Sequence, residues 1–81
     1  MPVLTLYGKP GCHLCDDARA AVREALAGHD AELREVDVTL DPVLENRYGA
    51  HIPVVAIDGE ELFEYFVDGR ALAERLDKVG A

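Results

Sequence analysis

Residues 8–22 read GKPGCHLCDDARAAV, and this stretch decides the fold. It places the two cysteines of the chain, Cys12 and Cys15, directly after a Pro-Gly pair and before an alanine-rich run. The preceding segment 3–7 mixes β-branched, aliphatic and aromatic residues, which is typical of a buried strand. We therefore expect the chain to pass from a strand into a helix at the cysteines, with the helix over residues 12–27.

Apolar spacing supports this helix. Apolar side chains recur at intervals of three and four residues, and Gly28 offers a place for the helix to stop. The residues expected on its inner face are Leu14, Ala18, Ala21, Val22, Ala25 and Leu26.

Three further segments predict strands. Residues 32–39 (ELREVDVT) and 52–58 (IPVVAID) fit a second and a third strand. The pair Asp58-Gly59 suits a two-residue hairpin turn, because glycine accepts a positive φ without steric cost. The hairpin would return as an antiparallel fourth strand over residues 61–67.

Capping residues mark two more helices. Asp41-Pro42 is an N-cap followed by proline at the first helical position, and Gly49 ends this short helix. Asp68 caps the last helix, with Val67 placed to pack on the residue four positions into it. The inner face of the last helix is expected to hold Leu72, Leu76 and Val79.

The predicted fold is therefore a single α/β domain over residues 1–81, in the order β-α-β-α-β-β-α. Strand, long helix and strand imply a right-handed crossover between two parallel strands, and the hairpin adds an antiparallel pair. The result is a four-stranded mixed sheet flanked by helices.

The composition is that of a globular domain and excludes several classes of protein. Sixteen acidic against eight basic residues give a net charge of −8, whereas a nucleic-acid-binding domain needs a basic footprint. No segment approaches the roughly 18 apolar residues of a membrane span, and the first residues lack the charged start of a signal peptide. We expect a cytoplasmic monomer that binds neither nucleic acid nor membranes, and in that compartment a close cysteine pair indicates redox catalysis or metal binding.

The spacing and position of the cysteines favour redox chemistry. Residues i and i+3 share one helix face with Cβ atoms about 5–6 Å apart, which suits a disulfide that opens and closes with little backbone movement. Cys12 falls at the helix N-terminus, where unpaired N–H groups and the helix dipole stabilise a thiolate. Because the thiolate attacks in disulfide exchange, Cys12 is the expected nucleophile and Cys15 the resolving residue.

Neighbouring charges are expected to tune this pair. Lys9 and His13 would add positive charge that stabilises the thiolate; for each, the alternative is an exposed residue with little influence. Asp16 and Asp17 oppose a thiolate, and their simpler role is to favour the helix N-terminus.

Two other interpretations of the pair are weaker. A zinc site needs three or four ligands, and the chain has no second cysteine pair to join Cys12, Cys15 and the nearby His13, so no metal is expected. A structural disulfide across three residues would close too short a loop to restrict the unfolded chain much.

The segment 7–18, YGKPGCHLCDDA, resembles the active-site segment of glutaredoxins, in which a Lys-Pro-Gly-Cys-x-x-Cys run joins the first strand to the first helix. The segment 51–59, HIPVVAIDG, is similar to their cis-proline loop and following hairpin. The whole predicted order is that of the minimal thioredoxin-like (glutaredoxin-like) fold. The Cys-His-Leu-Cys-Asp form and the short length are most similar to a small bacterial group of glutaredoxin-like proteins.

The resemblance implies roles for a second segment. Ile52-Pro53 would be a cis peptide lying beside the cysteines, and the backbone of Ile52 would pair with the extended backbone of the substrate, a short form of strand addition. Ile52 and Pro53 are therefore the predicted substrate-binding residues.

The chain also departs from the family pattern. Tyr65 and Phe66 replace the paired glycines beside which glutaredoxins hold the glutamyl end of glutathione, which argues against tight glutathione binding. Arg47 is a candidate for the other glutathione carboxylate or an ordinary exposed helix residue. Leu6 stands where thioredoxins carry a buried acid used in proton transfer, so that group is missing here.

The sequence thus predicts a thiol–disulfide oxidoreductase without a bound cofactor. Its partner would be a protein disulfide or a small-thiol mixed disulfide. Its reductant would be glutathione, another small thiol, or an enzyme of the thioredoxin-reductase type. The alternative is a non-catalytic adaptor or electron-relay module docked to one partner, for which Phe63, Tyr65 and Phe66 offer an aromatic surface. By strand alternation Phe63 and Tyr65 share a face, and core packing is the competing explanation for at least some of them.

Overall fold

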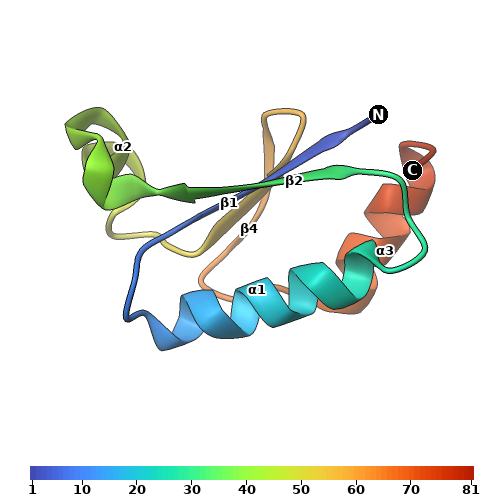
Figure 1. Ribbon diagram of the computed structural model, residues 1–81, viewed down its shortest axis with the longest axis horizontal. Helices are drawn as coiled ribbons and strands as arrows, with labels where there is room; N and C mark the ends of the chain where they lie inside the picture. Colours follow the sequence, from blue (N-terminus) through green and yellow to red (C-terminus); the bar gives the residue numbers. More distant parts are fainter.

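The computed structural model describes all 81 residues and has the expected order of elements (Figure 1). These are β1 (Val3–Gly8), α1 (His13–Leu26), β2 (Glu32–Asp37), the 3₁₀ turn η1 (Val38–Leu40), α2 (Pro42–Tyr48), β3 (Val54–Ile57), β4 (Glu60–Glu64) and α3 (Gly69–Lys78). The strand order is β2-β1-β3-β4. Strand β1 pairs parallel with β2 and antiparallel with β3, which pairs antiparallel with β4, so the predicted mixed sheet is confirmed.

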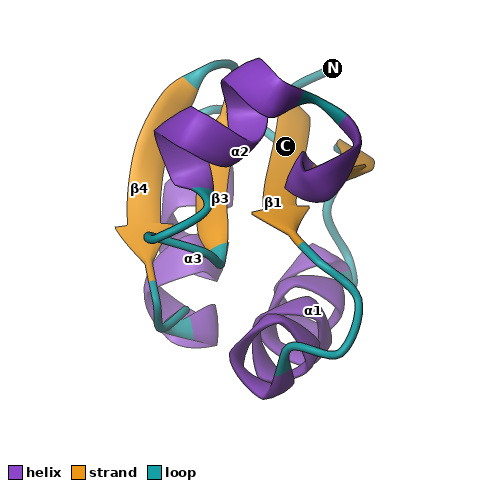
Figure 2. Cartoon of the chain, turned by 90° about the vertical axis from the view of Figure 1, so that its left-hand side faces the viewer, coloured by secondary structure: helices purple, strands orange, loops and turns teal.

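The main core lies between one face of the sheet and the helices α1 and α3, which run along that face (Figures 1 and 2). Alternation along β1 directs Leu4 and Leu6 into this core, where they meet Val22 of α1 and Leu72 and Leu76 of α3. All five side chains are nearly inaccessible to water. Burial of a side chain of this size stabilises the fold by about 1.5–3 kcal/mol, so this layer holds α1 rigidly against the sheet.

A second, smaller cluster lies at the end of β1 where the chain leaves for α1. The ring of Tyr48 in α2 stacks on Tyr7 of β1 with centroids 4.3 Å apart. The buried members of this cluster are Cys15, Val38, Tyr48, Ile52 and Val54, and Cys12 packs against it. Because α2 closes this end of the sheet, the cluster brings the cysteine segment and the Ile52 segment together.

The predicted caps and turns are present. Asp58 and Gly59 both have positive φ, 49° and 87°, as a two-residue hairpin turn of the primed type requires. The Asp41 carboxylate accepts the Val43 amide at 2.9 Å at the start of α2. The Asp68 carboxylate accepts two amides of the first turn of α3, at 3.0 and 3.2 Å, and the preceding Val67 is buried in the main core with Leu72.

Three strand predictions were too long. The third strand covers Val54–Ile57 rather than residues 52–58, because the cis peptide before Pro53 precedes it and the Asp58-Gly59 turn follows it. The second strand ends at Asp37, because the Asp37 carboxylate accepts the amide of Thr39 at 2.9 Å and turns the chain into η1. The fourth strand ends at Glu64 rather than at residue 67, because Tyr65 has a φ of +65° that no strand residue adopts.

Two predicted core positions were wrong. Leu14 lies in the first turn of α1 and half of its surface is exposed. Val79 is the residue after the end of α3, and it is exposed rather than part of the inner face.

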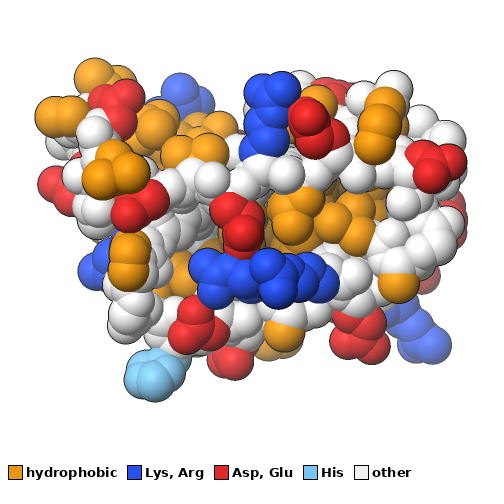
Figure 3. Space-filling model, viewed as in Figure 1, with side chains coloured by type: hydrophobic (Ala, Val, Ile, Leu, Met, Phe, Trp, Pro, Cys, Tyr) orange, Lys and Arg blue, Asp and Glu red, His pale blue; other side chains and the backbone are white.

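None of the helices is both long and apolar enough to cross a membrane. On the face seen in Figure 3, basic side chains lie between acidic ones, and apolar atoms protrude over the α2 end, where Leu40 and Val43 are exposed.

Candidate active site

Cys12 is the N-cap residue of α1. Its backbone is extended, with φ −101° and ψ 112°, and Gly11 before it has a φ of +73°, so the Pro-Gly pair turns the chain sharply from β1 into the helix. The Cys12 sulfur accepts the backbone N–H of Cys15 at 3.2 Å, the hydrogen bond that an N-cap oxygen would accept in an ordinary helix. The sulfur therefore sits on the otherwise unpaired amides at the start of the helix.

The two sulfurs have different environments. Both cysteines are in the free thiol form; Cys12 is partly exposed, whereas Cys15 has no exposed surface. The side chain of Cys12 is close enough to Cys15 to help raise the pKa of the Cys15 thiol. The sulfurs thus lie within reach of each other, and only one of them meets solvent.

Gly8 at the end of β1 makes room for the buried sulfur. A Cβ atom on Gly8 would lie 3.1 Å from the Cys15 sulfur and 3.3 Å from its Cβ. These distances are tighter than most contacts of real Cβ atoms, so a side chain at this position would require Cys15 to shift by a few tenths of an ångström.

The environment of Cys15 keeps it protonated. Burial, and after it the hydrogen bond to the Cys12 sulfur, raises the pKa of Cys15 from 9.0 to about 11. The backbone amide of Lys9 and the positive charge of Arg19 act in the opposite direction on this pKa. Cys15 is therefore a neutral donor to Cys12 until something removes its proton or changes the charge on Cys12.

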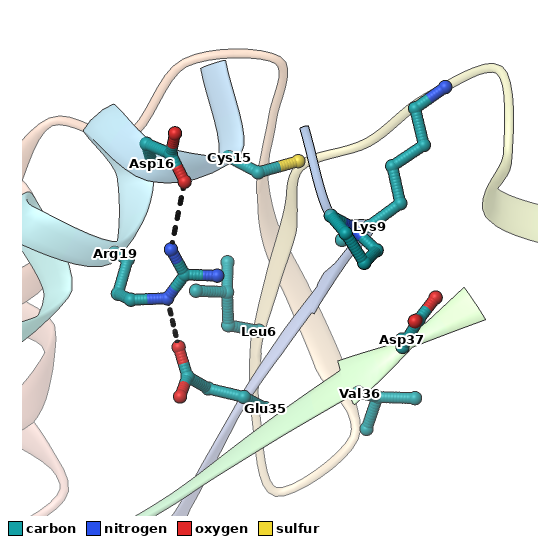
Figure 4. A pocket seen from close by; sticks show the side chains of 10 residues that line it. Leu6, Lys9, Cys15, Asp16, Arg19, Glu35, Val36 and Asp37 are labelled. Carbon is teal, nitrogen blue, oxygen red and sulfur yellow. Dashed lines mark hydrogen bonds and ion pairs between the residues drawn. The ribbon is translucent and has the colours of Figure 1, made fainter. Parts of the chain in front are cut away.

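A cavity of about 340 Å³ lies behind Cys15, between the start of α1 and the strands β1 and β2 (Figure 4). Arg19 spans it: its Nη1 donates to the Asp16 carboxylate at 3.0 Å, and its Nε donates to Glu35 of β2. These two carboxylates raise the pKa of Arg19, so its charge is permanent. Cys15 and a fixed cation, Arg19, therefore line the same cavity.

The Ile52-Pro53 segment lies beside the cysteines, as the packing of Ile52 with Cys12 and Cys15 in one cluster shows. The peptide bond between Ile52 and Pro53 is cis, which confirms that prediction. Both residues are buried, and β3 begins directly after them.

The side chains of the other predicted site residues are exposed to solvent. Lys9 is exposed and reaches Cys15 through its backbone amide rather than its side chain. His13 is exposed and forms no hydrogen bond or ion pair within the chain. Arg47 is exposed and pairs with Glu61 at 3.6 Å.

No group of three His, Cys, Asp or Glu side chains is arranged to hold a metal ion. Sequence reasoning missed the parts played by Gly8, Arg19 and Tyr65. Arg19 stands four residues after Cys15, a spacing that places both on one helix face. Gly8 and Tyr65 carry no comparable local signal.

The comparisons with known proteins agree with this geometry. The family model described as "Glutaredoxin-like domain (DUF836)" matches residues 3–77. The X-ray structure of the X. campestris protein XcR50 is similar to the chain, with a TM-score of 0.77, 38% identity, and coverage of 93% of this chain and 96% of that chain. The solution structure of protein Ne2328 from Nitrosomonas europaea has a TM-score of 0.77 and 28% identity, covering 93% and 91%.

A mutant thioredoxin from Halobacterium salinarum shares the fold, with a TM-score of 0.71, 24% identity, and coverage of 95% of this chain and 73% of that chain.

Proposed function

The chain belongs to the glutaredoxin-like domain family, and from this membership together with the site geometry we propose that it is a thiol–disulfide oxidoreductase in which Cys12 attacks and Cys15 resolves. One observation carries the proposal. The partly exposed Cys12 sulfur accepts the Cys15 amide at 3.2 Å at the start of a helix, while the second sulfur, that of Cys15, is buried. An accessible sulfur held at a helix N-terminus with a second thiol nearby is what a reactive redox pair requires.

The reaction proceeds in two exchange steps. The Cys12 thiolate attacks one sulfur of the substrate disulfide, forms a mixed disulfide and releases the other substrate sulfur as a thiolate, which takes up a proton. Cys15 then loses its proton and attacks the Cys12 sulfur. The second substrate sulfur leaves, and the two electrons of the Cys12–Cys15 dithiol have reduced the substrate.

Formation of the mixed disulfide lowers the pKa of Cys15 and so makes it a better nucleophile for the second step. In the mixed disulfide the Cys12 sulfur carries no charge and accepts hydrogen bonds poorly, so two of the causes that raise the pKa of Cys15 are lost. Arg19 remains and continues to favour the Cys15 thiolate. The Cys15 thiolate is therefore scarce before the substrate reacts and more abundant in the mixed disulfide, where it is required.

The remaining assignments follow from the same proposal. The Ile52-Pro53 segment orients the substrate backbone beside Cys12, and Lys9 and His13 contribute positive charge. The substrate is a protein disulfide or a small-thiol mixed disulfide, the reductant is glutathione, another small thiol or a reductase, and the compartment is the cytoplasm. No bound organic cofactor takes part in these steps.

Trapping tests the proposal. Cys15→Ser should accumulate mixed disulfides that appear on non-reducing gels and disappear with dithiothreitol, because the complex with Cys12 is not resolved. The matched control, Cys12→Ser, keeps a cysteine in the same motif and should accumulate none. A Cys15→Ser variant that traps nothing, from a wild type that reduces no disulfide, would favour the adaptor function.

Comparing reductants then identifies the electron donor. The oxidised protein is mixed with glutathione and, separately, with NADPH and thioredoxin reductase, and the return of the dithiol form is followed. Since Tyr65 and Phe66 replace the paired glycines of glutaredoxins, we expect slow reduction by glutathione relative to dithiothreitol.

A further inference from the structure

The turn that follows β4 is centred on Tyr65, in a backbone conformation unusual for a tyrosine. Its φ is +65°, and the amide of Phe66 donates to the carbonyl of Glu64 at 2.7 Å across it. A bond from residue i+2 to residue i with a positive φ between them defines the rarer and more strained type of γ-turn. Glycine would adopt this φ without a steric penalty, so the tyrosine side chain has to be explained by something else.

Tyr65 bonds to both sides of the Ile52-Pro53 peptide. Its backbone amide donates to the carbonyl of Pro53 at 2.8 Å, and its hydroxyl donates to the carbonyl of Ala50 at 3.0 Å. The two bonds bracket residues 51 and 52. Figure 2 shows the connection between α2 and β3 passing close to the end of β4, where Tyr65 begins the turn toward α3.

A third contact fixes the hydroxyl of Tyr65. Its proton is committed to Ala50, so the oxygen accepts from Nδ1 of His51 at 3.2 Å. The same His51 nitrogen lies 3.7 Å from the Glu64 carboxylate. The phenol oxygen therefore contacts both Ala50 and His51, while Glu64 at the end of β4 lies beside the same His51 nitrogen.

Core packing does not explain this residue. Tyr65 is 46% exposed and belongs to neither apolar cluster, whereas Val67, two residues later, is buried in the main core. Backbone strain at a residue outside both apolar clusters is typical of a functional position, where the surrounding structure maintains the strained conformation.

We propose that Tyr65 is a positioning residue that holds the loop 50–53 in the orientation with which Ile52 receives an extended disulfide substrate. This inference rests on the proposed oxidoreductase function and deepens it. The substrate class it favours is a disulfide within a peptide chain, because only such a substrate has a backbone to align with a loop held in place. A small disulfide without a backbone gains nothing from it.

Steady-state kinetics test the proposal with a peptide disulfide as substrate and dithiothreitol as reductant. Tyr65→Phe removes the hydroxyl and keeps the ring, and it should raise KM for the peptide about three- to tenfold with kcat little changed, as expected for the loss of one or two hydrogen bonds. Reduction of a small disulfide, and alkylation of Cys12 by iodoacetamide, should stay at the wild-type rate. The control Arg75→Gln breaks an exposed hydrogen bond to Glu60, away from the cysteines and the proline loop, and should leave KM unchanged.

Stability measurements separate positioning from folding. Tyr65→Gly and Tyr65→Ala both lose the ring and differ only in their tolerance of a positive φ. The glycine variant should melt several degrees above the alanine variant, yet both should show the raised KM. A glycine or phenylalanine variant that binds the peptide as well as the wild type would overturn the inference while leaving the oxidoreductase function intact. A wild type that reduces neither substrate would refute the proposed function, and this inference with it.

Discussion

The charge on the Cys12 sulfur controls the proton on Cys15, and replacing Cys12 with serine tests this coupling. The pKa of Cys15 is about 11 in the reduced protein, mainly because the residue is buried and secondly because it donates to the Cys12 sulfur. Cys12→Ser removes the sulfur but not the burial. We therefore expect the pKa of Cys15 to fall below about 11 and to remain above 9.0, its ordinary value.

The size of the effect on the Cys15 thiolate follows from the two limiting pKa values. Between 9.0 and about 11, the fraction of Cys15 ionised at neutral pH differs by a factor of about 100. Every pH unit by which the mixed disulfide lowers this pKa makes the resolving thiolate about ten times more abundant. In the proposed mechanism, a modest fall in the pKa of Cys15 on formation of the mixed disulfide is thus enough to make the attack of Cys15 on Cys12 much faster.

Nuclear magnetic resonance of protein labelled with ¹³C at cysteine Cβ measures this titration at each sulfur without needing access for a reagent. In a Cys12→Ser background, Arg19→Gln should raise the midpoint of Cys15, because a cation facing the same cavity is lost. Arg23→Gln is the matched control, since Arg23 lies one turn later and is exposed. The reasoning is refuted if Cys15 titrates below 9.0 in the reduced wild type, or if Cys12→Ser leaves its midpoint in place.

The same shift appears as a pH dependence of folding. The folded state holds the Cys15 proton up to about pH 11, whereas the unfolded chain releases it near 9.0. The stabilisation is therefore complete below about pH 9 and is lost as the pH rises to about 11, with a limit of about 2–3 kcal/mol. Urea unfolding of the reduced protein should show this loss, and the oxidised protein, which has no Cys15 proton, should not.

Three further substitutions have defined outcomes in equilibrium unfolding. Gly8→Ala places a methyl group 3.1 Å from the Cys15 sulfur; it should cost about 1–3 kcal/mol and slow closure of the disulfide in a stopped-flow assay. Asp68→Ala removes the acceptor of two amides at the start of α3 and should cost about 1 kcal/mol, with Asp68→Ser restoring most of it. Asp77→Asn removes the negative charge of the carboxylate that raises the pKa of His29 above 6.5. The charged pair stabilises the fold below about pH 6.5 and is lost as the pH rises through the raised value, so this variant should be destabilised at acidic pH and nearly unaffected at alkaline pH.

The sequence predicted those parts of the fold that are encoded by neighbouring residues. Pro-Gly before Cys12, Asp41-Pro42, Asp58-Gly59 and Asp68 each specify a local backbone geometry, and all four are present. The order of elements follows from these signals and from the apolar periodicity. The cis peptide before Pro53 was predicted from the family resemblance and not from local spacing.

The predictions that failed depended on contacts between distant segments. Leu14 fits the apolar spacing of α1, but it belongs to neither apolar cluster and half of its surface is exposed. The role of Gly8 cannot be found from local sequence because the atom that excludes a side chain there belongs to Cys15, on another element. Tyr65 and Phe66 continue the apolar run of β4 in sequence, yet the chain turns at Tyr65 to bond with residues 50 and 53.

These exceptions surround one small region. A sequence that specifies a single fold usually agrees with local rules at every level, and its violations gather at functional or strained positions. Here a strand position, Gly8, has no side chain. Cys12 provides a sulfur acceptor where an N-cap residue normally provides oxygen. Tyr65 has a backbone conformation that suits glycine. Gly8 and Cys12 contact the sulfur of Cys15, and Tyr65 bonds to the loop packed beside it. Three unrelated local penalties that converge on one pair of sulfurs are better explained by selection for the chemistry of those sulfurs than by the needs of the fold.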